Sequence, residues 1–197
     1  MNNRILVTYA SRTGTTAEVA EAIGAVLALT LPASLSPADM LHSSTSRAGG
    51  LHDVDVLPMQ DVRNLSEYSA VIAGSAIRAA RWLPEGVQFV RTHQTALRHK
   101  PFAMFTVCIT LAMSNSEQYR AAVSGWTAPV RAIVKPLSEG LFPGMLDFSR
   151  LPINWETLKL RATVAMGIFP RGDHRDWNAV HAWAEGLKPM LRMPVSV

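Results

Sequence analysis

The sequence, 197 residues long, lacks several features by which whole classes of protein are recognised. It has a single cysteine, Cys108, which we interpret as a buried strand residue; no internal disulfide can form, and this fits a reducing compartment. No apolar run approaches the roughly 20 residues of a transmembrane helix. The first residues carry no apolar signal region, and we therefore interpret the protein as cytoplasmic.

Positively charged residues only slightly outnumber negatively charged ones, and the net charge is +4. There is no dense basic block and no basic-aromatic platform, so nucleic acid is not an expected partner. The weak positive field favours anionic ligands and leaves contact with an anionic membrane surface open. The histidines show no metal-ligand spacing, and no Ser-His-Asp or Cys-His arrangement can be inferred, so no metal is expected and the catalytic residues stay unknown.

Two common nucleotide-binding motifs are missing from the N-terminal strand, loop and helix. The loop at residues 10–16 is neither Gly-x-Gly-x-x-Gly nor a lysine-containing P-loop, which argues against a dinucleotide and against triphosphate transfer. It has many hydroxyls and one glycine where a helix begins, and this suits a phosphate monoester such as that of FMN. The Ser and Thr hydroxyls would add hydrogen-bond donors, and Gly14 would let the backbone come close to the ligand.

Apolar runs and helical patterns alternate along the rest of the chain. Strands are expected at residues 4–9, 52–58, 70–73, 101–109 and 136–142, and helices at 17–27, 84–98, 115–134, 151–168 and from 173. Pro129 should kink or split its helix, and Asp173 and Asp176 should form a variant capping box. Residues 29–50, rich in Ser, Thr and Pro, read as an irregular insertion. The pattern predicts one domain over residues 1–197, an α/β doubly wound five-stranded parallel sheet with helices on both faces.

Three loops leave the carboxyl ends of expected strands with small or hydroxyl residues, at 10–16, 74–82 and 109–114. Because ligands of such sheets bind beyond the carboxyl ends of the strands, we expect these loops to converge on one site.

Several of these motifs also resemble those of a known protein family. The stretch Val7 to Thr16 resembles the flavodoxin signature. Gly74-Ser75-Ala76-Ile77-Arg78 with Trp82, and Gly172 to Trp177, are similar to the flavodoxin-domain proteins typified by the FMN-dependent, quinone-linked protoporphyrinogen oxidase of haem biosynthesis. The resemblance covers nearly the whole chain except about residues 29–50, and it implies a flavodoxin-like fold with strand order 2-1-3-4-5.

The resemblance also implies roles for residues. The residues implied to bind the phosphate of FMN are Ser11, Arg12, Thr13, Gly14, Thr15 and Thr16. The residues implied beside the isoalloxazine ring are Ala76, Ile77, Arg78 and Ala79, with Thr110, Leu111 and Ala112 at its other edge. The implied function is an FMN-dependent oxidoreductase that passes electrons from a reduced organic substrate to a quinone. The alternative is a non-enzymatic electron-transfer protein that docks to redox partners, and a flavodoxin-like module without flavin is a third. The sequence leaves the oligomeric state open.

Some residues allow more than one interpretation. Arg78 and Arg81 either lie in a solvated loop or anchor a substrate carboxylate or an acidic partner. Trp82 is expected to be a packing anchor rather than a flavin-stacking group. No aromatic residue occurs at 76–80 and the chain is basic, which favours the oxidoreductase over an acidic electron shuttle.

Overall fold

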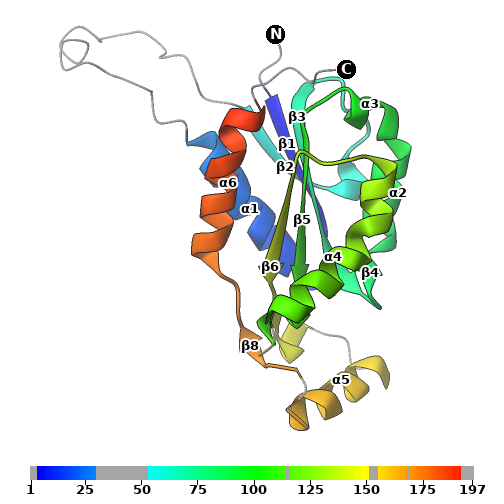
Figure 1. Cartoon of the computed structure of the whole chain (residues 1–197), viewed down its shortest axis with the longest axis vertical. Helices are drawn as coiled ribbons and strands as arrows, with labels where there is room; N and C mark the ends of the chain where they lie inside the picture. Colours follow the sequence, from blue (N-terminus) through cyan, green and yellow to red (C-terminus); the bar gives the residue numbers. More distant parts are fainter. Residues whose placement is uncertain (1–3, 30–52, 114–115, 151–154, 168, 192–197) are drawn as a thin grey trace, which may run out of the picture.

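In the computed structural model of the chain, a twisted sheet lies between two layers of helices (Figure 1). The structure describes residues 4–29, 53–113, 116–150, 155–167 and 169–191. In spatial order, the parallel strands are β2 (Asp53–Pro58), β1 (Arg4–Ala10), β3 (Tyr68–Arg78), β5 (Phe102–Cys108) and β6 (Ser138–Pro143). The predicted doubly wound order 2-1-3-4-5 is confirmed, because the extra strand β4 (Arg81–Trp82) only pairs antiparallel with the end of β3.

The register of the strands aligns their carboxyl ends. Ala10 at the end of β1 lies opposite Ser75 of β3, and Ser75 lies opposite Thr106 of β5. The strand order reverses at β1, which pairs with β2 on one side and with β3 on the other. The crevice in which such sheets bind ligands therefore lies where the loops after β1, β3 and β5 begin.

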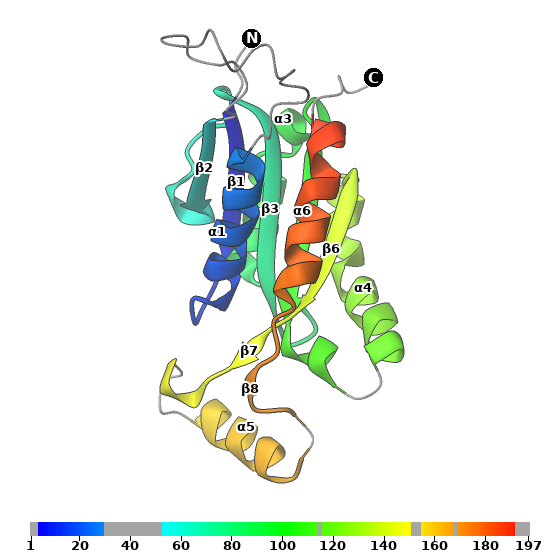
Figure 2. The same ribbon diagram turned by 90° about the vertical axis from the view of Figure 1, so that its left-hand side faces the viewer.

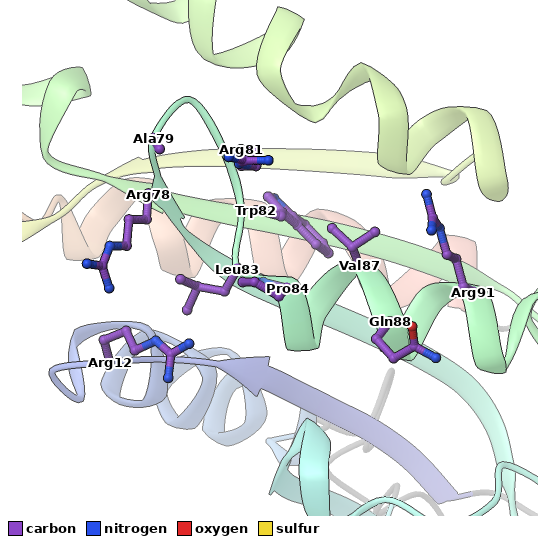
Figure 3. Close-up of a pocket in the computed structure, with 10 residues that line it drawn as sticks. All are labelled: Arg12, Arg78, Ala79, Arg81, Trp82, Leu83, Pro84, Val87, Gln88 and Arg91. Atoms are coloured by element: carbon purple, nitrogen blue, oxygen red, sulfur yellow. The ribbon is translucent and has the colours of Figure 1, made fainter.

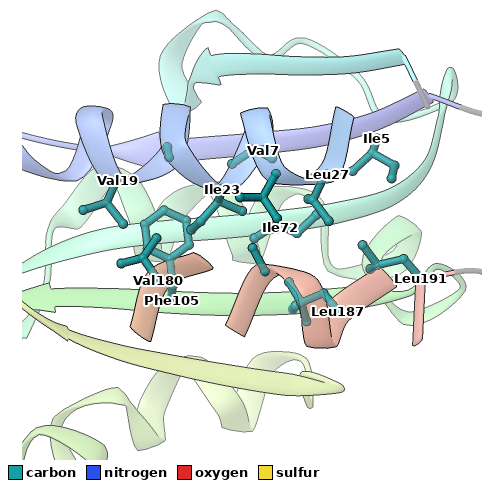
Figure 4. Packing of buried hydrophobic residues seen from close by; sticks show 14 of the residues in the cluster. Ile5, Val7, Val19, Ile23, Leu27, Ile72, Phe105, Val180, Leu187 and Leu191 are labelled. Atoms are coloured by element: carbon teal, nitrogen blue, oxygen red, sulfur yellow. The ribbon is translucent and has the colours of Figure 1, made fainter. Parts of the chain in front are cut away.

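One face of the sheet is covered by α1 (Thr15–Ala28) and α6 (Trp177–Leu191), which pack side by side (Figure 4). Their apolar stripes meet the inward side chains of the strands, as their helical spacing predicts. Full burial of one such side chain stabilises the fold by roughly 1.5–3 kcal/mol. This core includes Ile5, Val7, Ile72 and Phe105 from the strands, Val19, Ile23 and Leu27 from α1, and Val180, Leu187 and Leu191 from α6.

The other face is covered by α2 (Pro84–Thr92), α3 (Gln94–Arg98) and α4 (Ser116–Ile133). The single helix expected at 84–98 was wrong, because His93 leaves helical geometry, with its ring 4.8 Å from that of Phe89. Pro129 does not split α4, which continues through it.

Between β6 and α6 the chain leaves the sheet as an extension, described over residues 144–150, 155–167 and 169–176 (Figure 2). Its two short strands pair antiparallel, Met145 with Asp173, and it lies beyond the carboxyl ends of the sheet strands. The helix expected at 151–168 is observed over 155–165, with residues 151–154 and 168 outside the described part. Its elements are β7 (Met145–Leu146), η4 (Phe148–Arg150), α5 (Trp155–Ala165) and β8 (Gly172–Asp173).

Two short 3₁₀ helices follow β2 and β5, namely η2 (Met59–Asp61) and η3 (Ile109–Ala112). From residue 30 on, the insertion expected at 29–50 lies outside the described residues. Within the described residues, none of the helices has the length and apolar character needed to cross a membrane.

Candidate functional site

The loop after β1 is folded around Gly14. Gly14 has φ +86°, a left-handed conformation that glycine adopts without the strain a side chain would add. Its N–H donates to the Ser11 hydroxyl at 3.1 Å, and the hydroxyls of Thr13 and Thr15 lie 3.4 Å apart. Thr16 is 1% exposed, the most enclosed hydroxyl residue of the loop. The structure therefore gathers the hydroxyl residues at the first turn of α1.

The amino end of α1 has no side-chain cap. Glu18 N–H bonds to the Gly14 carbonyl, which starts the helical ladder. The first N–H groups of a helix have no partner within the helix, and the macrodipole adds partial positive charge there. A hydroxyl-rich loop before such an uncapped helix can hold an anion.

Two arginines from the extension reach the first turn of α1. Arg150 donates to the Glu18 carboxylate at 2.6 Å and to the Thr13 carbonyl at 3.4 Å. Arg175 also binds Glu18, and it holds Asp173 at 2.6 Å while its guanidinium stacks over Trp177. The hydrogen bonds from Arg150 and Arg175 lower the pKa of Glu18, and hydrogen bonding to Asp173 contributes most to raising the pKa of Arg175.

The hydrogen bonds of Asp173 and Asp176 correct the expected variant capping box. Asp173 lies in β8 and binds Arg175, so it does not start the last helix. Asp176 does cap α6, because its carboxylate accepts from Ala179 N–H at 3.0 Å. Neither arginine was predicted as part of the site, because each reaches α1 across more than a hundred residues. Arg175 lies in the stretch Gly172 to Trp177 that carries the resemblance, but no binding role was assigned to it.

The loop after β3 is a tight hairpin. Ala79 and Ala80 at its tip have φ +49° and +57°. The left-handed region costs a non-glycine residue roughly 1–2 kcal/mol, so the surrounding structure must hold the tip in place. Arg78 of β3 and Arg81 of β4 lie opposite each other in the antiparallel register on either side of the tip, and both are exposed.

Buried hydrogen bonds anchor this hairpin to the sheet. Trp82 is 1% exposed and donates through its indole N–H to the Thr106 hydroxyl at 2.9 Å. The Ser75 hydroxyl accepts from Leu83 N–H at 3.1 Å. The prediction that Trp82 is a packing anchor is confirmed, and these bonds offset the strain of the tip.

The loop after β5 begins as η3, with Leu111 buried and Thr110 and Ala112 half-buried. The second loop was expected to begin at residue 74, but the structure continues β3 to Arg78, so Ile77 lies near the end of that strand. Ile77 packs against the cluster that contains Leu111 and Cys108. Cys108 is buried, as predicted, and burial raises the pKa of its thiol. The second and third loops therefore meet.

The first loop contacts α2, the helix that follows the hairpin, because Arg12 donates to Glu85 in the first turn of α2 at 3.2 Å. Beside the hairpin, a groove of about 690 Å³ is lined by residues of both loops and of α2 (Figure 3). Arg12, Arg78 and Ala79 are part of its lining, so the structure brings the first loop and the tip of the second together as expected.

The Glu18 pairs lead to a prediction on pH. The lowered pKa of Glu18 means that its pairing stabilises the fold fully above the unfolded value near 4.5, and this contribution is lost as the pH falls through the lower folded value. Glu18→Gln should therefore lower stability at neutral pH, and its difference from wild type should shrink in acid. Urea unfolding across pH measures this. Glu21→Gln, an exposed change on the same helix, should show no such trend; a gap constant with pH would contradict the assignment.

Comparison with known proteins identifies the family of the chain and supports its fold. A family model described as a flavodoxin domain matches residues 33–167, well over half of the chain. The match includes the second and third loops and omits residues 10–16, so the interpretation of the first loop depends on its geometry. No match was found among curated protein sequences.

Solved structures show the same fold at low identity. An oxidoreductase from Corynebacterium diphtheriae superposes with a TM-score of 0.52 at 11% identity, over 97% of this chain and 98% of its own. A short-chain flavodoxin associated with a bacterial microcompartment gives a TM-score of 0.50 at 10% identity, over 95% and 97%. At such identities the likeness concerns the fold alone.

Proposed function

The chain belongs to the flavodoxin-domain family, and from this premise we propose that it binds FMN and acts as an oxidoreductase. The observation that carries the proposal is the loop before α1. It combines left-handed Gly14, clustered hydroxyls and an uncapped helix start. This donor set suits a phosphate monoester, which needs several N–H and O–H donors and no lysine.

The phosphate end of the proposed site consists of one loop and one distant side chain. Arg150 lies beside it, with Nη1 3.7 Å from the position that a Cβ on Gly14 would take. The Arg150 guanidinium would place a positive charge near the phosphate, and the same guanidinium also pairs with the Glu18 carboxylate. The proposed phosphate ligands are Ser11, Arg12, Thr13, Gly14, Thr15 and Thr16.

The ring end of the proposed site lies between the second and third loops. Leu111 and the half-buried Ile77 would give the flavin ring an apolar wall and exclude water. When bound, FMN supplies hydride and electron transfer, and the protein supplies position and electrostatics. The proposed ring contacts are Ala76, Ile77, Arg78, Ala79, Thr110, Leu111 and Ala112.

For the reaction, we infer an activity similar to protoporphyrinogen oxidase. A reduced organic substrate such as a porphyrinogen would lose electrons and protons, and a quinone would take them up. The exposed Arg78 and Arg81 beside the ring end support a substrate that carries acidic groups. No catalytic acid or base is assigned.

The second candidate is a non-enzymatic electron-transfer protein. The structural likeness to a short-chain flavodoxin favours it, although that likeness concerns the fold. Reduction by a flavodoxin reductase, with no turnover of porphyrinogen or quinone, would select this candidate. Turnover of both substrates would select the enzyme.

The first test is flavin uptake. Purified protein incubated with FMN should retain about one flavin per chain after gel filtration, because the uncapped helix and the hydroxyls bind the phosphate. Visible absorption and quenching of flavin fluorescence measure the uptake. A protein that stays colourless and leaves added FMN free would contradict the proposal.

A further inference from the structure

The groove beside the β3–β4 hairpin runs along α2 and opens to solvent (Figure 3). Its accessible apolar surface is formed by the exposed Pro84 and the half-buried Val87, which lie over Trp82 and Leu83, each only 1% exposed. Arg12 and Arg78 lie at one end and Arg91 at the other, with Arg81 on the hairpin side. We call this feature the arginine groove.

All the charged side chains that line the arginine groove are positively charged. Four arginines line it, all of them exposed, and no lining residue in the described part of the chain is acidic. Arg12 pairs with Glu85 next to the groove. The guanidinium groups of Arg81 and Arg91 have no hydrogen bond or ion pair with another described residue. The positive charges of Arg81 and Arg91 are therefore not neutralised by contact with the described part of the chain.

The form of the groove indicates what kind of anion fits. An apolar centre rimmed by arginine is the usual composition of a protein interface, where arginine is enriched. A site for a small anion would hold polar groups that converge in its interior, whereas the polar groups here stand on the rim. Single-stranded nucleic acid needs an exposed aromatic platform, and Trp82 is buried.

We propose that the arginine groove is a docking site for an acidic segment of a partner protein. An apolar side chain of the segment rests on Pro84 and Val87, and its carboxylates bind Arg81 and Arg91. Val87 and Arg91 are one helical turn apart on α2, so both face the same ligand. The groove ends at Arg12 and Arg78, so a docked redox partner is held next to the proposed ring site.

The test uses a fluorescein-labelled amphipathic peptide with leucine at i, i+4 spacing and glutamate elsewhere, followed by fluorescence anisotropy. The wild-type chain should bind it, more weakly as salt rises, and should bind the glutamine counterpart poorly. Arg81→Gln with Arg91→Gln should weaken binding about tenfold or more. Val87→Ser should also weaken it.

The matched control removes the same charge elsewhere. Arg63→Gln with Arg98→Gln changes two exposed arginines outside the groove, and peptide affinity should stay within about twofold. An equal loss in both double variants would mean that only net charge matters, and it would overturn the proposal. Groove-dependent binding of citrate or a single-stranded oligonucleotide that displaces the peptide would also overturn it.

Flavin titration of the same variants separates this inference from the proposed function. Arg81 and Arg91 are not among the proposed FMN ligands, so FMN affinity should be unchanged in the groove variant. If the wild type binds no FMN but binds the peptide through the groove, the proposed function fails and the docking site stands. If FMN binds and the peptide does not, only the docking site fails.

Discussion

Replacing Thr13 and Thr15 together with alanine is expected to weaken FMN binding by about 2–4 kcal/mol. Each threonine is expected to supply a hydroxyl donor to the charged phosphate, and the loss of one such donor costs roughly 1–2 kcal/mol. The two hydroxyls lie 3.4 Å apart at the start of α1, close enough to face one phosphate group. The expected change in dissociation constant is roughly 30- to 700-fold. Titration of flavin fluorescence measures it.

Riboflavin provides the internal control, because it has the same ring and no phosphate. Its affinity should be nearly the same in the wild type and the double variant. Thr95→Ala, an exposed threonine in α3, should change neither affinity. An equal loss for FMN and riboflavin would mean that the loop was damaged rather than deprived of phosphate donors, and an unchanged FMN constant would exclude this loop as the phosphate site.

Gly74→Ala is expected to destabilise the fold by about 3 kcal/mol or more, the upper part of the range for overpacked cores. Gly74 lies in β3 opposite Phe105 of β5, and a Cβ at this position would overlap the Phe105 ring. That ring is fully buried and contacts Trp183 edge-on, with the centroids 6.3 Å apart. Because the ring is 0% exposed, relief of this overlap must displace buried atoms of the ring or of the strands. Urea unfolding measures the loss.

A second substitution at Phe105 tests the mechanism. Phe105→Leu removes ring atoms, so its combination with Gly74→Ala should be less destabilised than the sum of the two single changes. Gly125→Ala is the matched control, because a Cβ there meets no atom within 4 Å on the exposed side of α4. This change should be neutral or stabilise by up to about 1 kcal/mol. Additive single changes would show that the ring is not the obstacle.

The sheet could be predicted from sequence because its strands are buried on both faces. Every residue of β5 is buried, and such a strand reads as a continuous apolar run. The alternation with helices then restricts the topology, since parallel crossovers are right-handed. The loops at the ends of β1, β3 and β5 follow from the same pattern.

The hairpin could not be predicted, because tertiary anchoring creates it. A tight hairpin of this kind normally has glycine or asparagine at its tip, whereas the tip here is Ala79-Ala80. The left-handed backbone is maintained by buried hydrogen bonds from Leu83 to Ser75 of β3 and from Trp82 to Thr106 of β5. Thr106 lies on another strand, 24 residues beyond Trp82, so a local sequence pattern contains no trace of this partner.

The ion pairs of Glu18 with Arg150 and Arg175 join parts of the chain that are synthesised at very different times. Glu18 is separated by 132 residues from Arg150 and by 157 from Arg175. A chain is synthesised from its amino end, so the loop and α1 leave the ribosome long before either arginine exists. The first loop of the site is therefore among the first parts to be made, whereas its outer ion pairs form only after most of the chain has been translated. A nascent chain that ends before residue 150 contains every hydroxyl of the loop and neither arginine.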